Sequence, residues 1–217
     1  MITFHDLAPA GSVSTLDEYA PSDFTPADVI LCRNTAPLVA LAFGLIRRGV
    51  GCRVLGRDFG ANLIALVEGT KTYTLPDLTV ALDRLREKEV GRALRKGDQP
   101  AAAAIDDKFN CLQLFTANAT SVEGVVQKLK DLFSDESRGL LTLSTIHKAK
   151  GLEWPTVFLL DRALMPSKFA KSDWERRQES NLMYVAITRA KLHLKYITSN
   201  SWSELGHSPN ETNNEHN

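Results

Sequence analysis

The segment LLTLSTIHKAKGLEWPTVFLL, residues 140–160, constrains the fold more than any other part of the sequence. Short, nearly continuous apolar runs at both ends have the length and composition of buried strands. The loop between them, from Ser144 to Gly151, is polar. In an open α/β sheet, ligands gather where strands end in such loops. The segment therefore predicts a buried sheet with a binding site beside it.

The rest of the chain supplies the other elements of an α/β domain. The pattern predicts a strand at 29–32, a helix at 37–48 with Pro37 in its first turn, and a strand at 52–55. Such strand–helix–strand units build parallel sheets. A helix is expected at 174–189 and a strand at 192–197. Between residues 61 and 135 the apolar residues instead follow helical spacing.

These patterns divide the chain into four parts. Residues 1–27 are rich in Ser, Pro, Asp and Gly and are expected to be a loosely structured N-terminal segment. Residues 28–60 and 136–205 form the sheet domain, and residues 61–135 form a helical insert. The polar tail, residues 206–217, is expected to be disordered. The predicted fold class is α/β, a parallel sheet flanked by helices, with a mostly helical inserted lobe.

Composition narrows the function classes. The chain has 43% hydrophobic and 24% charged residues, as ordinary globular proteins do, and no apolar run long enough for a membrane span. With 26 basic and 26 acidic side chains it has no net charge, so any nucleic-acid contact must be local. Its three cysteines lack metal-site spacing, and no metal site is predicted. A cytoplasmic location fits this cysteine usage best.

The loop of the 140–160 segment carries the first candidate site. Lysines there supply positive charge for phosphate, hydroxyl and imidazole groups can hydrogen-bond to backbone oxygens, and Gly151 permits a close turn. The polar side chains are Thr145, His147, Lys148, Lys150 and Glu153. A solvated basic loop between two core strands is the alternative. Trp154 is expected to pack beneath the loop.

A second candidate is ESNLMYVAITRAKLHLKYI, residues 179–197. Its apolar residues follow helical spacing and are expected in the core. Arg189 closes this helix just before the next strand and has two interpretations. It complements the helix dipole at the C-terminal end, or it projects into a ligand cleft as a guanidinium for phosphate.

Three segments together resemble the UvrD/Rep/PcrA-like superfamily 1 DNA helicases. T-I-H-K-A-K-G-L-E-W, Thr145–Trp154, resembles the family's motif V, and Y-V-A-I-T-R-A, Tyr184–Ala190, resembles its motif VI. V-I-L-C-R-N-T-A-P, Val29–Pro37, resembles motif IV. The resemblance implies the second, C-terminal RecA-like domain, with a P-loop NTPase fold.

In this family two RecA-like domains enclose ATP, and the resemblance implies a role for each matching residue. Arg33 and Arg189 would reach the γ-phosphate as catalytic arginine fingers, because a guanidinium can meet two phosphoryl oxygens at once. Glu153 would accept a hydrogen bond from the ribose, with Lys150 and Gly151 also on the ATP side. Thr145, His147 and Lys148 would contact single-stranded DNA.

The sequence departs from the family in three respects. Cys32 stands where members often have an aromatic residue that stacks on adenine, which leaves adenine stacking from this half unsupported. The helical insert is short. No G-x-x-x-x-G-K-[ST] run occurs, and Asp161 is interpreted as a strand-end residue. ATP and Mg²⁺ would therefore be held mainly by the missing N-terminal motor domain, and the isolated chain is predicted to be inactive as an ATPase.

The resulting prediction is the C-terminal motor domain of an ATP-dependent DNA helicase. Its partners would be single-stranded DNA and the N-terminal RecA-like domain, in cis or in trans. The alternative is a stand-alone, non-enzymatic module that binds single-stranded nucleic acid or a partner helicase.

Overall fold

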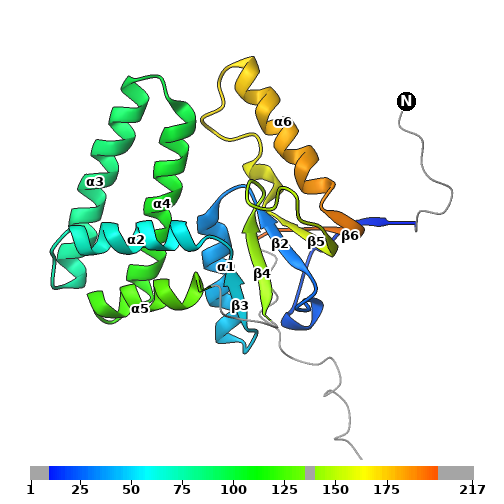
Figure 1. Ribbon diagram of the computed structural model, residues 1–217, viewed down its shortest axis with the longest axis horizontal. Coiled ribbons are helices and arrows are strands. Elements are labelled where there is room, and N and C mark those ends of the chain that lie inside the picture. Colours follow the sequence, from blue (N-terminus) through cyan, green and yellow to red (C-terminus); the bar gives the residue numbers. More distant parts are fainter. Residues whose placement is uncertain (1–9, 135–139, 200–217) are drawn as a thin grey trace, which may run out of the picture.

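A six-stranded sheet, parallel at every described pair, forms the centre of the protein in a computed structural model that describes residues 10–134 and 140–199 (Figure 1). The strand order is β1-β6-β5-β2-β4-β3. The strands are β1 Ser12–Thr15, β2 Val29–Cys32, β3 Cys52–Val54, β4 Leu141–Thr145, β5 Trp154–Leu160 and β6 Ala190–Ile197. The predicted α/β class with a parallel sheet is confirmed.

Helices cover both faces of this sheet. Alternate residues of a strand point to opposite faces, and β2 shows this division clearly. Ile30 and Cys32 lie in one core cluster with helix α1 (Thr35–Arg47), whereas Val29 and Leu31 lie in a second cluster with helix α6 (Asp173–Ile187). The central strand β2 is therefore buried on both sides, as the apolar run VILC predicts.

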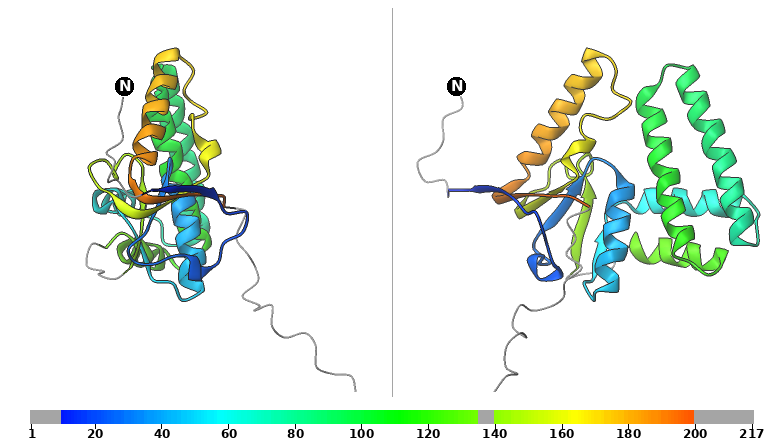
Figure 2. Two further views of the ribbon diagram at one scale, coloured as in Figure 1. Left: turned by 90° about the vertical axis from the view of Figure 1, so that its right-hand side faces the viewer. Right: turned by 180° about the vertical axis from the view of Figure 1, so that it is seen from behind.

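Four helices lie between β3 and β4 in sequence and form the inserted lobe. They are α2 Arg57–Gly69, α3 Leu75–Arg95, α4 Gln99–Ala117 and α5 Val122–Leu132. Figure 2 shows them gathered beyond the β3 edge of the sheet, with α3 and α4 as an antiparallel pair. Side-chain caps begin three of these helices: Thr74, Asp98 and Ser121 each accept a hydrogen bond from a first-turn backbone N–H.

Two consecutive aspartates on α4 attach the lobe to the sheet domain. Asp107 accepts hydrogen bonds from the backbone N–H groups of Thr35 (2.7 Å) and Ala36 (3.0 Å), and so caps α1. Asp106 pairs with Arg86 of α3 at 2.5 Å and with Lys168, on the loop before α6, at 2.9 Å. Burial opposes ionisation of Asp106, but the two cations prevail and lower its pKa. The lobe is thus tied to α1 and to the loop before α6.

From residue 10 on, the N-terminal segment is more ordered than the sequence analysis predicted. The polar strand β1 pairs with β6, and Tyr19 and Phe24 are buried, with Phe24 packing edge-to-face on Phe158 at 4.8 Å. The sheet therefore begins before the predicted boundary at residue 28. Short 3₁₀ turns occur at Pro21–Asp23 and Arg162–Leu164. The predicted disordered tail lies outside the described residues.

Three further observations complete the fold. All three cysteines are free and buried, and burial raises the pKa of Cys32 and Cys52 to about 12. Trp154 packs against the second cluster, which includes Ile146 and Ala149 of the loop above it, as predicted. Within the described ranges, no helix combines the length and the apolar character needed to cross a bilayer.

Two glycines of α2 provide a test of how this helix packs on the lobe. A Cβ on Gly60 would lie 2.6 Å from Cβ of Phe133, whereas a Cβ on Gly69 would meet nothing within 4 Å. We predict that Gly60→Ala lowers the free energy of unfolding by about 1–3 kcal/mol through overpacking. Gly69→Ala, the control, should leave it unchanged or raise it by up to about 1 kcal/mol. Urea denaturation measures both, and equal effects would contradict this packing.

Candidate functional site

The candidate residues divide between the two ends of the parallel strands. Arg33 and Asp161 directly follow β2 and β5, and Thr145 ends β4, so these three lie at the carboxyl edge of the sheet. Glu153 and Arg189 directly precede β5 and β6, which pair from Trp154 and Ala190 onward, so these two lie at the amino edge. The seven residues of β5 separate the edges by about 20 Å.

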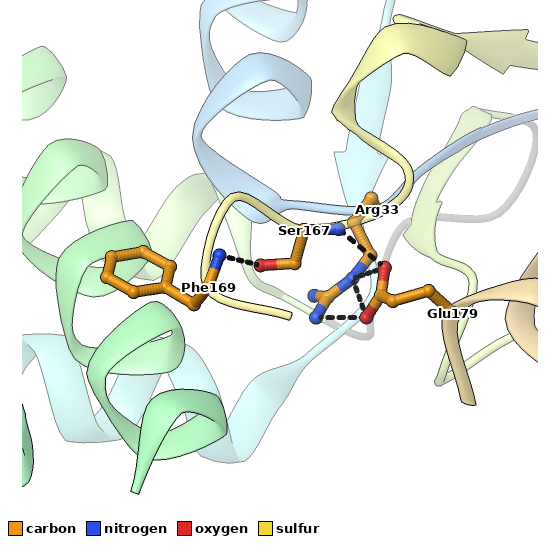
Figure 3. Close-up of polar contacts among 4 residues, drawn as sticks. All are labelled: Arg33, Ser167, Phe169 and Glu179. Atoms are coloured by element: carbon orange, nitrogen blue, oxygen red, sulfur yellow. Dashed lines mark hydrogen bonds and ion pairs between the residues drawn. The ribbon is translucent and has the colours of Figure 1, made fainter. Parts of the chain in front are cut away.

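At the carboxyl edge, Arg33 is held by an ion pair with Glu179 of α6 (Figure 3). Nε of Arg33 donates to both carboxylate oxygens at 3.1 Å, and Nη2 donates to Oε1 at 3.0 Å. The carboxylate also accepts a hydrogen bond from the backbone N–H of Ser167 at 3.1 Å. The two charged side chains are only 17% and 11% exposed. Removal of either partner would leave a largely buried charge unpaired.

His147 adjoins this ion pair and responds to both of its charges. Desolvation, followed by the positive charge of Arg33, lowers the pKa of His147 from 6.5, while Glu179 acts in the opposite direction. The imidazole is therefore mostly neutral at pH 7. A neutral imidazole offers one hydrogen-bond donor and one acceptor. His147 is thus suited to directional hydrogen bonding rather than to simple charge attraction.

The loop that begins at Thr145 is anchored to its neighbouring strands. Ile146 donates its backbone N–H to the carbonyl of Cys32 at 3.0 Å, which fixes the loop against β2. Lys148 lies over the Phe59 ring at 5.7 Å, with Nζ 3.5 Å from the carbonyl of Leu55 beyond β3. Partial burial lowers the pKa of Lys148. Both Thr145 and Lys148 are thus placed at the carboxyl edge.

At the amino edge, backbone carbonyls orient Arg189. Its Nε donates to the carbonyl of Val185 at 3.1 Å and its Nη1 to the carbonyl of Leu152 at 3.0 Å. Nη2 donates to Oγ1 of Thr188 at 3.1 Å. The guanidinium therefore caps the end of α6 and also reaches the loop before β5. Both interpretations of Arg189 from the sequence remain compatible with this geometry.

The other amino-edge candidates are exposed. Glu153 forms a long ion pair with Lys191, at 3.8 Å, with both side chains more than half exposed. Gly151 turns the loop with φ of +85°, a conformation that favours glycine. Lys150 is exposed on the same loop, between the two edges. The loop therefore carries candidate residues from one edge of the sheet to the other.

The structure separates two residues that the sequence analysis assigned to one phosphate site. Arg33 and Arg189 lie at opposite edges of the sheet. Arg33 is bound by Glu179 in the first half of α6, whereas Arg189 follows the end of that helix. The structure instead groups Arg33 with Thr145, His147 and Lys148. Cys32 is fully buried in the core beneath this edge, which removes it from contact with any ligand.

Sequence reasoning missed Glu179, which is the principal partner of Arg33. Glu179 belongs to the charged run WERRQE at the start of α6. In the structure it is buried, unlike its charged neighbours Arg176 and Arg177. Its spacing on α6 was the available signal, since Glu179, Leu182 and Ala186 follow the i, i+3, i+7 pattern of an inward face.

The position of the carboxyl-edge residues follows from the topology. Adjacent strands β2 and β5 are followed by helices α1 and α6, which cover opposite faces. Ligands of open α/β sheets bind in the crevice at such a switch point, outside the carboxyl ends of the strands. Two cavities lie there, of about 230 and 690 Å³. Ser167 and Phe169, on the segment between β5 and α6, line both of them.

Comparisons with known proteins find relatives that match the segments in which the candidate residues lie. Residues 111–201 match the UvrD-like helicase C-terminal domain. The chain is 38% identical over 190 residues to the ATP-dependent DNA helicase UvrD1 of Mycobacterium leprae, covering 79% of this chain and 24% of UvrD1. It is 43% identical over 74 residues to the ATP-dependent DNA helicase PcrA of Bacillus subtilis, covering 32% of this chain and 10% of PcrA. The chain thus spans about a quarter or less of these relatives.

The Arg33–Glu179 pair makes a prediction about stability. Glu179→Gln removes the charge that neutralises a mostly buried guanidinium, so the free energy of unfolding should fall by about 2–3 kcal/mol. Glu153→Gln is the matched control, because its partner Lys191 is exposed, and it should cost less than about 1 kcal/mol. Chemical denaturation compares the two variants. Equal losses would show that the Arg33–Glu179 pair does not hold α6 to β2.

The pKa of His147 provides a second prediction, which NMR titration can check. Arg33→Gln removes a charge that lowers this pKa, so the pKa should rise. Glu179→Gln removes a charge that raises it, so the pKa should fall. The exposed His193 serves as an internal reference in the same spectra. Shifts in the same direction for both variants would be incompatible with the opposite effects of Arg33 and Glu179 on His147.

Proposed function

We propose that this chain, which belongs to the UvrD-like helicases and carries their C-terminal domain, acts as the second motor domain of an ATP-dependent DNA helicase. Its relatives are ATP-dependent DNA helicases of which it spans a quarter or less, so activity requires further parts. The observation that carries the proposal is the separation of the candidate residues onto two edges of one sheet. A motor needs a nucleotide site and a strand site that are distinct but connected.

In this proposal the amino edge completes the ATP site. Three N–H groups of Arg189 donate hydrogen bonds that fix the guanidinium. Its other N–H groups would donate to phosphoryl oxygens. Charge spreads over these oxygens in the transition state, where a fixed guanidinium stabilises it. Glu153 precedes Trp154, whose backbone N–H donates to the carbonyl of Arg189 at 2.9 Å. The exposed carboxylate of Glu153 would accept a hydrogen bond from the ribose. Lys150 and Gly151 complete this side.

The surface around Arg189 supports docking of a second motor domain at this edge. Three exposed apolar side chains lie on the end of α6 and on the adjoining loop, and Arg189 bonds directly to the backbone of one of them. They are Leu152 (45% exposed), Tyr184 (63%) and Ile187 (41%). Exposed apolar groups next to a functional side chain are typical of a surface that a partner covers. The N-terminal motor domain would bury them and present the phosphates to Arg189.

The carboxyl edge would bind single-stranded DNA. Thr145 and His147 would hydrogen-bond to the strand, and Lys148 would supply a local positive charge in a chain with no net charge. Arg33 joins this group in place of its predicted role at the γ-phosphate. The polypeptide itself connects the two edges, since helix α6 and the 145–153 loop each run from one edge of the sheet to the other.

The residues of this chain fit an ATP site in which another domain supplies the groups that hold Mg²⁺ and the phosphates. Its sequence contains no G-x-x-x-x-G-K-[ST] run. Among the described residues there is also no group of three or more His, Cys, Asp or Glu side chains suited to a metal ion. In the proposal, the N-terminal motor domain therefore holds Mg²⁺ and the phosphates of ATP, and the isolated chain does not hydrolyse ATP.

The proposal predicts a large loss of ATPase activity for Arg189→Ala. The chain would be combined with an N-terminal motor domain that carries the phosphate loop, and DNA-stimulated ATP hydrolysis would be measured. The turnover number should fall by about 10³–10⁵-fold, as expected for an arginine finger. Arg95→Ala, at an exposed position on α3, is the control and should have no effect. An unchanged rate for Arg189→Ala would rule out this role.

A further inference from the structure

The smaller switch-point cavity has the features of a binding site in its own right. It has a volume of about 230 Å³ and lies where the start of α4, the loop before α6 and the first turns of α6 meet the carboxyl edge. Its apolar lining comes from Pro100, Phe169, Ala170 and Trp174, and its polar lining includes Arg33, His147 and Gln178. Apolar walls with a few converging polar groups are typical of ligand sites.

Trp174 is the most unusual residue of this cavity. It lies in the first turn of α6 and is 65% exposed, although tryptophan is the side chain with the largest aromatic surface to bury. The lining also includes Phe169, whose ring points toward α4 in Figure 3. The indole of Trp174 is therefore available to stack on a planar group that enters the cavity.

The walls are held in place without a ligand. A capping box fixes the start of α6, in which Glu175 accepts from the backbone N–H of Ser172 at 2.8 Å and donates its own N–H to the Ser172 hydroxyl at 3.2 Å. Ser167 donates its backbone N–H to Glu179, and its hydroxyl accepts from Phe169 at 3.3 Å. A preorganised cavity loses little entropy when it binds a ligand.

The charges around the cavity favour an anionic polymer with planar side groups. Both lining carboxylates are already occupied, because Glu175 is held by the capping box and Glu179 by Arg33. Lys171, Arg176 and Arg177 are exposed close to Trp174 in sequence, at the start of α6. A ligand with a flat heterocycle inside the cavity and phosphate groups outside it would match this arrangement.

We propose that this cavity receives one unstacked base of the single strand, stacked on Trp174 and hydrogen-bonded along its edge by His147 and Gln178. The inference rests on the proposed strand-binding function of the carboxyl edge, and it adds a base subsite that is contiguous with His147. Stacking accepts any base, since every base has a π-face. The subsite would thus bind the strand without reading its sequence.

The first test is the affinity of the chain for fluorescein-labelled oligothymidylate, measured by anisotropy. Trp174→Ala should weaken binding by about fivefold to a hundredfold, the range expected for loss of one base stack. Trp174→Phe should retain most of the affinity, because phenylalanine also stacks. Tyr73→Ala is the matched control: Tyr73 is 89% exposed on the helical lobe, outside the cavity, and its loss should have no effect.

The second test reports on stacking itself. In a variant with Trp154 and Trp202 replaced by phenylalanine, Trp174 is the only indole, and oligothymidylate should quench its fluorescence. An abasic oligonucleotide of the same length should bind more weakly and leave the fluorescence unquenched. Normal affinity of Trp174→Ala without quenching would overturn the base subsite and leave the strand-binding function standing. Absence of any anisotropy change with the unsubstituted chain would contradict both.

Discussion

The ion pair between Arg33 and Glu179 is the interaction on which the carboxyl edge of this protein depends. It joins the end of β2 to α6, residues that are far apart in sequence, and it holds the Ser167 backbone in the same network. Through this network it sets the wall of the 230 Å³ cavity and the electrostatic environment of His147. Because both groups are largely buried, either one alone would destabilise the arrangement.

The direction of α6 connects this interaction to the other edge of the sheet. One end of the helix carries Glu179 and Trp174, and the other end leads into Arg189, whose guanidinium caps it. If DNA binding at the carboxyl edge displaced the start of α6, the end of the helix beside Arg189 would move as well, because a helix moves as a rigid element. This provides a physical route by which the two proposed sites of the motor domain would affect each other.

Local patterns in the sequence predicted the buried strands and the long helices, because VILC, LLTLS and TVFLL must be covered on both sides and the lobe has clear helical spacing. Strand β1 was missed, since SVST has no apolar face and is fixed only by pairing with β6. The edge on which each candidate lies also could not be predicted. Arg33 and Arg189 each adjoin a strand, but only the strand order and direction show that they lie at opposite edges of the sheet.

The central claim is that strand and nucleotide use opposite edges of one sheet. Backbone amide shifts of the isotope-labelled chain, recorded by NMR during titration with oligothymidylate, test it most directly. The account predicts that the changes gather at Arg33, at residues 145–148 and at residues 167–178. Residues 151–153 and 188–191 should change only when the N-terminal motor domain and ATP are added. Strand-induced changes centred on Glu153 and Arg189, with none at Arg33 and His147, would contradict the account.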